Sequence, residues 1–343
     1  TGTRGWFDVS QERLVTPEGG AMHWSRLPDI FIGAMVLLLQ PLIGTPAAET
    51  VAITVWPLFQ LGWVLAAAVL CLRRLGATLS GQLAGLFFFC TSFALVNFIP
   101  GRIDHHGFGL ALTLTAFACL LSPTRSMRSG LVAGLCVAAM LTIAIENLPA
   151  AGLILGASGL AWIVRGKKET RRLRGFAAAL IVGAVAAYCL DAPGVGRLRQ
   201  VCDAYGQSHF AALLVAGAGL GASSLAIGRA QSWQARFVFM ALAGLATLVA
   251  FVAINPSCLG DPYSGLGETV RTSWLSSVGE ARSMPAVLSA EGWSGLYYYG
   301  FGLAGLACAL FCALRAPDGL KLGRVMLLGF CLVGFILYMM NIP

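Results

Sequence analysis

The densest group of chemically active side chains is the segment Gly101-Arg102-Ile103-Asp104-His105-His106-Gly107, which lies between two apolar stretches. Charged groups at a membrane boundary lose hydration, so one acid, one arginine and two imidazoles this close together are expected to have partners. Asp104 and His106 are two residues apart at the expected start of a helix, whose N-terminus favours an anion. The group could bind a divalent cation, with Arg102 holding a phosphate oxygen. Alternatively, Asp104 merely caps the helix beginning at Gly107, and the histidines lie among lipid headgroups.

A second polar group, Glu146-Asn147-Leu148-Pro149, lies at a tight turn between two apolar stretches. Glu146 could face a polar cavity, where it would contact substrate, or it could lie in the membrane interface. The residue types leave both interpretations open.

The third candidate is the polar stretch from Asn255 to Trp293. Its length of about 39 residues is typical of functional lids in compact proteins. Within it, Trp274-Leu275-Ser276-Ser277-Val278-Gly279-Glu280-Ala281-Arg282 combines aromatic, hydroxyl and charged side chains. A short amphipathic turn at the surface would explain these residues equally well.

A fourth group stands near the beginning of the chain, in Gly5-Trp6-Phe7-Asp8 and in Met22-His23-Trp24-Ser25-Arg26-Leu27-Pro28-Asp29. Aromatic residues beside Arg and Asp are typical of the belt at a membrane interface. They could also form the floor of a sugar site, with aromatic rings under the sugar and charged acceptors for its hydroxyls. The candidate substrate-binding residues here are Asp8, His23, Trp24 and Arg26.

The elements that must position these groups are membrane helices. Of the 343 residues, 57% are apolar and 11% are charged, whereas soluble domains carry about 25% charged residues. This composition excludes a soluble enzyme, a disulfide-stapled secreted domain and a disordered chain. The net charge of +8 is spread over short loops, which is typical of membrane orientation and not of nucleic-acid binding. The fold class is therefore an all-α polytopic membrane protein.

The apolar runs predict spanning helices at 49–72, 79–99, 107–122, 129–146, 148–165, 175–190, 209–228, 235–254, 294–314 and 323–342.

Alternating helices place five loops on one side of the membrane, at residues 73–78, 123–128, 166–174, 229–234 and 315–322. These loops and their boundaries hold most of the lysines and arginines but only two acids, Glu169 and Asp318. The positive-inside rule makes this side cytoplasmic. The polar segments and all four histidines, including His105 and His106, then lie on the outer side.

The same alternation constrains the apolar stretch from Pro28 to Gly44. If it spanned the membrane, residues 1–27 would be cytoplasmic, apart from the other polar segments. We therefore expect a re-entrant or interfacial outer helix at 28–44, although an ordinary spanning helix stays possible. This divides the chain into an outer loop at 1–27, the interfacial helix at 28–44 and a transmembrane bundle at 45–343. The chain opens on Thr and shows no signal peptide, so its start is expected to be missing.

Most of the ten cysteines lie in apolar spans, where Cys behaves as a small apolar residue. Cys202 and Cys258 both lie in outer loops, where an oxidising compartment would allow a disulfide between them. The sequence has no Cys-x-x-Cys, His-Glu-x-x-His or phosphate-binding Gly-Lys-Ser/Thr motif.

Taken in order, these segments resemble the catalytic subunit of oligosaccharyltransferase and its relatives in the GT-C superfamily of membrane glycosyltransferases. Trp6-Phe7-Asp8 lies in a long first outer loop, followed by the outer apolar helix at 28–44. Asp104-His105-His106 stands where the family has Asp-Asn-Glu or a similar acidic triplet. Asn147-Leu148-Pro149 is similar to the family's Asn-Leu-Ile-Pro turn, and Ser277-Val278-Gly279-Glu280 is similar to its Ser-Val-Ser-Glu motif.

The resemblance covers much of residues 5–293 and implies a GT-C-like helical bundle with long outer loops. It implies a glycosyltransferase in which a lipid-linked sugar donor enters from the bilayer and a divalent metal on the outer face binds its phosphate or pyrophosphate. Asp104, His106 and Glu280 would be the metal ligands, and Asp104 and Glu280 the catalytic acids. Arg102 and His105 would bind the donor phosphate. Imidazole in place of a carboxylate favours Mn²⁺ over Mg²⁺.

Two departures from the family pattern limit this assignment. The family's first catalytic acid would precede Thr1, so Asp8 is expected to be a secondary acid of the loop. The Trp-Trp-Asp-Tyr-Gly motif, which reads the protein acceptor, is absent. A glycan, lipid or polysaccharide acceptor is therefore expected more than asparagine in a protein.

Two other functions stay open. A transporter or flippase for a lipid-linked or anionic solute would need ionisable residues near mid-membrane, and almost every charge here lies at a span boundary. A non-catalytic GT-C-like subunit of an envelope complex is compatible with the missing first acid. In each case we expect an integral protein of the bacterial inner membrane with its site facing the periplasm.

Overall fold

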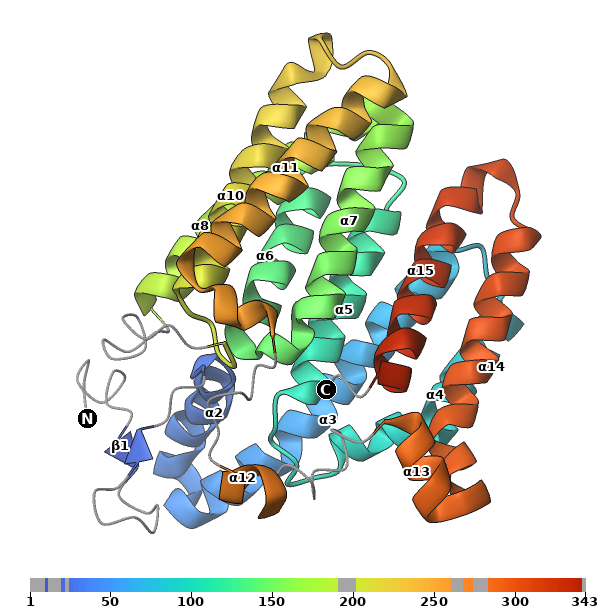
Figure 1. The fold of residues 1–343 in the computed structure, drawn as a ribbon. Coiled ribbons are helices and arrows are strands. Elements are labelled where there is room, and N and C mark those ends of the chain that lie inside the picture. The colour runs from blue at the N-terminus through green and yellow to red at the C-terminus, as the bar shows by residue number, and fades with distance from the viewer. Residues whose placement is uncertain are drawn as a thin grey trace.

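The structure is a computed structural model that describes residues 10–11, 20–21, 25–190, 202–260, 268–273 and 283–340. These residues form a bundle of antiparallel helices, with two short strands near the start of the chain (Figure 1). Five continuous helical segments are apolar and long enough to cross a membrane, and further apolar helices have 10–17 residues. The prediction of an all-α polytopic membrane protein is thereby confirmed.

Each predicted span except 79–99 corresponds to one helix, with boundaries shifted by a few residues. The helices are α3 (Thr45–Arg74), α4 (Leu79–Thr91), α5 (His106–Leu121), α6 (Met127–Ile143), α7 (Leu148–Arg165), α8 (Thr170–Leu190), α10 (Gln207–Leu225), α11 (Trp233–Ile254), α14 (Gly295–Leu314) and α15 (Asp318–Met340). Further elements are β1 (Ser10–Gln11), β2 (Gly20–Ala21), α2 (Leu27–Ile43), α12 (Glu268–Ser273) and α13 (Met284–Glu291). The strands pair antiparallel, with Ser10 opposite Ala21.

The predicted helix at 79–99 is wrong in its second half. The α-helix ends at Thr91, Ser92 has extended backbone angles, and a 3₁₀ helix follows at Phe93–Phe98. The Ser92 hydroxyl donates to the carbonyl of Phe89, which caps the helix end. Apolar residues continue through this break, so hydropathy alone does not reveal it.

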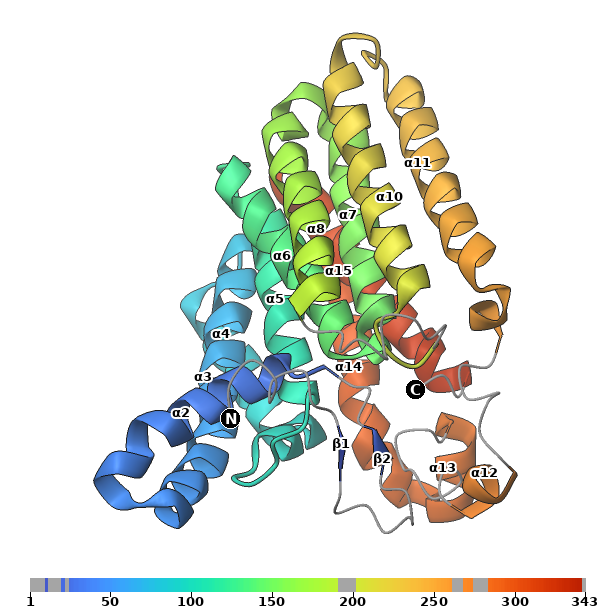
Figure 2. The same cartoon turned by 90° about the vertical axis from the view of Figure 1, so that its left-hand side faces the viewer.

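The short connections and the polar segments lie at opposite ends of the bundle. The turns joining α10 to α11 and α14 to α15 lie at the upper end in Figure 1, whereas β1, α12 and α13 lie at the lower end (Figures 1 and 2). The described parts of the polar segments predicted to share one side therefore lie at the same end. We call the lower end the outer end, following the positive-inside assignment.

Close helix contacts depend on glycine in the core. A Cβ added at Gly130 of α6 would lie 2.0 Å from the backbone oxygen of Arg172 in α8, and one at Gly175 of α8 would lie 2.2 Å from that of Met127. Only glycine allows these backbones to approach so closely, as is typical of helix pairs in lipid. Phe176, which lies beside Gly130, is fully buried.

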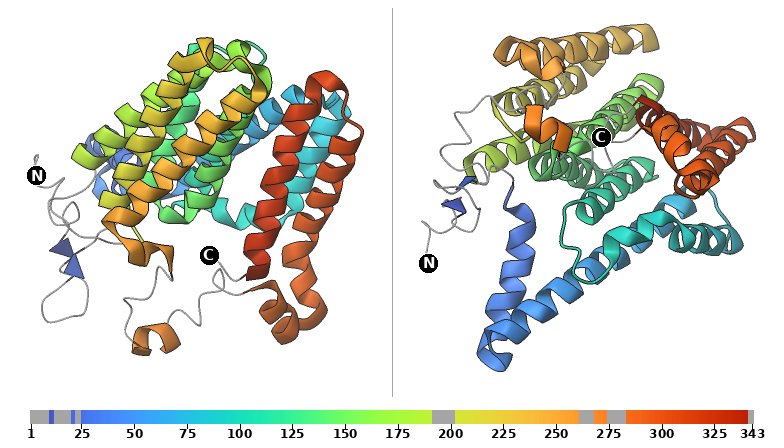
Figure 3. Two further views of the ribbon diagram at one scale, coloured as in Figure 1. Left: turned by 45° about the horizontal axis from the view of Figure 1, so that its top comes forward. Right: turned by 60° about the horizontal axis from the view of Figure 1, so that its bottom comes forward.

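The helix α2 lies at the outer end of the bundle and is inclined to the long helices such as α10 and α11 (Figure 2). It is joined to α3 through Gly44, whose φ of +78° favours glycine. Figure 3 shows α2 and α3 meeting at a sharp angle. Leu37, Leu38 and Leu42 are exposed on its surface. The interfacial position of this helix stays a prediction.

Two features stabilise the two ends of the bundle. At the inner end, the buried carboxylate of Glu169 forms ion pairs with Arg125, Arg165 and Arg172. At the outer end, Cys202 and Cys258 form a disulfide across a sequence separation of 56 residues. The predicted pairing of these two cysteines is confirmed.

Candidate functional site

The segment before α5 is held against α3. The chain leaves the 3₁₀ helix at Phe93–Phe98 and turns at Gly101, whose φ is +91°. The backbone N–H of Gly101 donates to the carbonyl of Ile53 in α3 at 3.0 Å. Residues 102–106 therefore start from a fixed point at the outer end of the bundle.

Asp104 uses both of its carboxylate oxygens locally. Its Oδ2 accepts from Arg102 Nε at 2.5 Å, and its Oδ1 accepts from the backbone N–H of His106 at 3.2 Å. His106 is the first residue of α5, so Asp104 satisfies a helix N-terminal donor. Asp104 therefore binds a donor of the first turn from the position before the N-cap residue, His105, and the helix begins at His106 and not at Gly107. Whether Asp104 also binds a metal stays a prediction.

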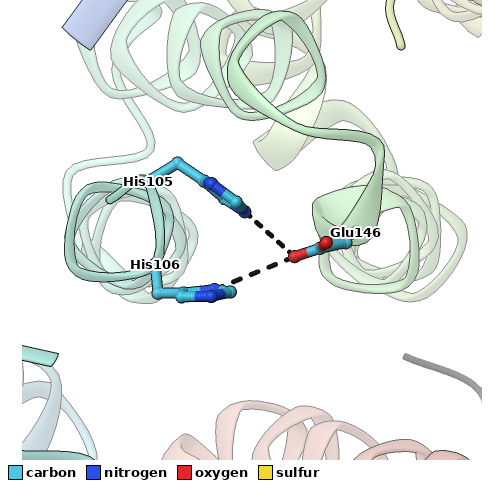
Figure 4. Close-up of side chains that lie close together, drawn as sticks. All are labelled: His105, His106 and Glu146. Atoms are coloured by element: carbon cyan, nitrogen blue, oxygen red, sulfur yellow. Dashed lines mark hydrogen bonds and ion pairs between the residues drawn. The ribbon is translucent and has the colours of Figure 1, made fainter. Parts of the chain in front are cut away.

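The two histidines at the start of α5 face Glu146, which lies just after the neighbouring helix α6. His105 Nε2 lies 2.9 Å from Glu146 Oε2, and His106 Nδ1 lies 3.8 Å from the same oxygen (Figure 4). The two imidazole rings are 4.4 Å apart between centroids. About a third of each histidine side chain and 43% of that of Glu146 are exposed, so solutes can reach the group. Glu146 thus faces two imidazoles, and its contact with a substrate stays a prediction.

The turn that carries Glu146 is fixed by its neighbour Asn147. After α6 ends at Ile143, a 3₁₀ turn at Ile145–Asn147 leads into α7. The Asn147 amide nitrogen donates to the carbonyls of Met140 and Ala144 at 3.1 and 3.2 Å. A Cβ at Gly109 of α5 would lie 2.5 Å from Asn147 Oδ1, so this side chain also packs against α5.

Sequence reasoning missed Gln60 on α3. Its side chain is fully buried, and within the described parts of the chain neither its amide nitrogen nor its amide oxygen has a hydrogen-bond partner. A Cβ at Gly107 would lie 2.3 Å from Gln60 Oε1, so the amide packs directly beside the start of α5. A buried amide of this kind is costly without a partner and is often explained by water or by function. A glutamine inside an apolar stretch was the available signal.

Trp56 lies one turn before Gln60 on α3. Its indole Nε1 is also buried without a hydrogen-bond partner among the described residues. Its ring stacks on Phe31 of α2 with 4.9 Å between centroids and meets Phe108 of α5 edge-on. These aromatic contacts attach α2 to the bundle next to the cluster.

The predicted site residues are thus partly brought together. Arg102, Asp104, His105, His106 and Glu146 share one region of the outer end. Arg26 lies directly before α2, and its carbonyl accepts from the Asp29 N–H. The remaining predicted residues lie outside the described residues, namely Asp8, His23, Trp24 and Glu280.

The cluster has the composition of a cation site. One nitrogen of His105, one nitrogen of His106 and one oxygen of Glu146 all lie within 4.8 Å of one another. Imidazole and carboxylate are common ligands of divalent transition metals in proteins. The same three groups could instead form only an ion-pair network when a histidine is protonated.

The fold is similar to that of an archaeal oligosaccharyltransferase. The crystal structure of the Archaeoglobus fulgidus oligosaccharyltransferase in complex with Zn and sulfate matches 98% of this chain with a TM-score of 0.55 and 15% identity. The structure of the Archaeoglobus fulgidus oligosaccharyltransferase AglB with an inhibitory peptide and a dolichol-phosphate matches 97%, with a TM-score of 0.58 and 15% identity. The structure of the same enzyme tethered to an acceptor peptide containing the NVT sequon matches 94%, with a TM-score of 0.60 and 15% identity.

The chain spans about two fifths of the length of these oligosaccharyltransferase chains, with 39%, 40% and 39% of them covered. No protein-family model and no curated protein matches the sequence. The likeness is therefore one of fold, and it confirms the predicted resemblance to an oligosaccharyltransferase-like bundle at that level.

Proposed function

We propose that this protein is a membrane glycosyltransferase that takes a sugar or glycan from a polyprenyl-phosphate or polyprenyl-pyrophosphate donor. The observation that carries the proposal is the group of Arg102, Asp104, His105, His106 and Glu146 at one end of a bundle with an oligosaccharyltransferase-like fold. The similar proteins were studied with a dolichol-phosphate and with an acceptor peptide, which supports lipid-linked donors and acceptors as the class of partner.

The charges of the group suit an anionic donor once a divalent cation is bound. Arg102 and Asp104 offset each other, and the Glu146 carboxylate leaves one negative charge if both imidazoles are neutral. A divalent cation would reverse this to one positive charge, which attracts a phosphate. A bound cation would act as a Lewis acid on the departing phosphate. The structure of the similar enzyme with Zn and sulfate supports a divalent cation without identifying it.

In the proposed reaction, the bond between the anomeric carbon and the donor phosphate oxygen breaks, and the phosphate leaves with the bonding electrons. The acceptor nucleophile forms the new bond to the anomeric carbon, and its proton passes to the departing phosphate or to water. Arg102, oriented by Asp104, would donate a charge-assisted hydrogen bond to the phosphate. Following the family resemblance, Glu280 would approach from the loop at 255–293, which would exclude water from the donor.

The acceptor is proposed to be a glycan, a lipid or a polysaccharide, because the protein-reading motif of the family is absent from the sequence. The proposed location is the inner membrane of a bacterium, with the cluster facing the periplasm, and the proposed partners include a larger membrane complex. Membrane lipid surrounds the bundle, and nucleic acid is not a partner.

The test is incubation of the purified protein with a radiolabelled polyprenyl-linked sugar, with and without a chelator. The proposal expects release or transfer of the sugar that depends on a divalent metal. Asp104→Ala and Glu280→Gln should abolish transfer while the protein still inserts normally. Full activity in either variant would contradict this mechanism.

Two alternatives have their own outcomes. Uptake of a lipid-linked or anionic solute into proteoliposomes that contain no sugar donor would favour a transporter or flippase. Absence of both transfer and uptake, together with co-purification in an envelope complex, would favour a non-catalytic subunit.

A further inference from the structure

We propose that His105, His106 and Glu146 are the protein ligands of the divalent cation, and that Asp104 is a positioning residue. This set differs from the ligands implied by the family resemblance, which are Asp104, His106 and Glu280. Cation binding by these three side chains can be measured without any donor. Its role in holding a donor phosphate rests on the function proposed above.

The spacing of the donor atoms is close to that around a single metal ion. Ligand atoms about 2.1 Å from one tetrahedral Zn²⁺ lie roughly 3.4 Å from one another. Here His105 Nε2 and His106 Nδ1 lie 2.9 and 3.8 Å from Glu146 Oε2, on either side of that value. One donor atom from each residue lies within 4.8 Å of the others, so rotation of the side chains can bring all three to one ion.

The two histidines reach this point although they are adjacent in sequence. Neighbouring residues of a helix point in different directions, so their side chains do not normally meet. His105 presents its distal Nε2 and His106 its proximal Nδ1, and both face the same carboxylate oxygen (Figure 4). Because both nitrogens face this one oxygen, both can bind an ion placed next to it.

Asp104 is turned to other partners. Its Oδ2 accepts from Arg102, and its Oδ1 accepts from the backbone of His106. It is not one of the three residues whose donor atoms lie within 4.8 Å of one another. Asp104 therefore holds the backbone of His106 and the guanidinium of Arg102 in place.

The ligand types predict which cation binds. Two imidazoles and one carboxylate favour transition metals such as Mn²⁺ and Zn²⁺ over Mg²⁺ and Ca²⁺, which prefer oxygen ligands. Each of the three side chains is partly exposed, at 33%, 30% and 43%. A bound ion could therefore keep open positions for an oxygen of a phosphate.

The first experiment measures Mn²⁺ binding to the full chain in detergent, from the loss of the free Mn²⁺ signal in electron paramagnetic resonance. We expect one saturable site per chain. Glu146→Gln and His105→Gln should each raise the Kd at least about tenfold. The matched control is Glu49→Gln, which removes an exposed acid of α3 and should leave the Kd unchanged.

A double variant separates Asp104 from the ligands. Arg102→Gln combined with Asp104→Asn removes the ion pair without changing the net charge. We expect its Kd for Mn²⁺ to stay within about threefold of the unaltered protein, a smaller change than loss of a ligand. A loss as large as that of Glu146→Gln would make Asp104 a ligand and overturn the assignment.

A ligand exchange tests direct coordination. Glu146→Cys places a soft thiolate at this position, which should shift selectivity from Mn²⁺ towards Cd²⁺. A cadmium-thiolate absorption band in the ultraviolet should appear at one equivalent of Cd²⁺, beyond any seen with Glu49→Cys. No such band, or unaltered Mn²⁺ affinity in Glu146→Gln and His105→Gln, would refute the site. Sugar transfer by a protein that binds no Mn²⁺ at these residues would refute the site but keep the proposed function, whereas Mn²⁺ binding at these residues without transfer would do the reverse.

Discussion

His105 and Glu146 are 41 residues apart in the sequence, and His105 Nε2 lies 2.9 Å from Glu146 Oε2. The two helices between them, α5 and α6, have nearly equal lengths of 16 and 17 residues and run antiparallel. The free ends of this hairpin are therefore level with each other at the outer end of the bundle. The polar cluster is a consequence of that equality, since an extra turn in either helix would separate the two side chains by about 5.4 Å along the axis.

Gly107→Ala should destabilise the protein by about 1–3 kcal/mol, because overpacking displaces neighbouring atoms. The new Cβ would lie 2.3 Å from Gln60 Oε1 and 2.9 Å from Phe98 Cε1. The melting temperature in detergent is the measurement, and Gly152→Ala, with no atom within 4 Å, is the control. Adding Gln60→Ala should restore part of the loss. Equal melting temperatures for the two single alanine variants would show that Gln60 does not pack against Gly107.

Glu169→Gln should destabilise the inner end strongly, by about 3–5 kcal/mol, because removal of one member of a buried ion pair leaves the other charge uncompensated. The Glu169 carboxylate is 2% exposed and pairs with Arg125, Arg165 and the equally buried Arg172. The measurement is resistance to unfolding by denaturing detergent. A loss no larger than that of the exposed Glu49→Gln would contradict the buried network.

Cys202→Ser should lower stability by about 2–4 kcal/mol, since the disulfide to Cys258 restricts the unfolded chain. Thermal melting with and without reductant measures this difference, and reductant should have no further effect on the variant. Cys90→Ser, which removes an exposed free thiol, is the control. If reductant does not change the melting temperature of the unaltered protein, the disulfide does not contribute to its stability.

The sidedness of the bundle can be measured with cysteine labelling in intact cells. Ser289→Cys, on α13, should react with a membrane-impermeant maleimide added outside, and Lys167→Cys should react only after lysis. Both positions are exposed, so accessibility differs only by the side of the membrane. The unaltered protein sets the background from its own cysteines. Labelling of Lys167→Cys from outside would show that the assigned orientation is wrong.

The positions of the helices were determined by the sequence itself. Each apolar run is bounded by polar residues, and a helix in lipid satisfies its own backbone hydrogen bonds, so the run and the helix coincide. Local caps mark the starts, as Ser126 does by accepting from the Ser129 N–H before α6. Loop charges and parity placed Cys202 and Cys258 on one side, which made their pairing predictable. The apolar run did not predict the helix break at Ser92, because apolar residues continue through it.

The composition of the cluster was decided only by the tertiary structure. The segment 101–107 was recognisable from its residue types, but the choice between Asp104 and Glu146 as partner of the histidines depends on side-chain directions. Asp104 contacts Arg102 and the N-terminus of α5, while Glu146 follows the last residue of the neighbouring helix α6. Gln60 reaches Gly107 from a third helix. Sequence patterns report local periodicity and burial, whereas these contacts depend on how long each helix is and how the helices pack. Such distances between helices exist only once the bundle has folded.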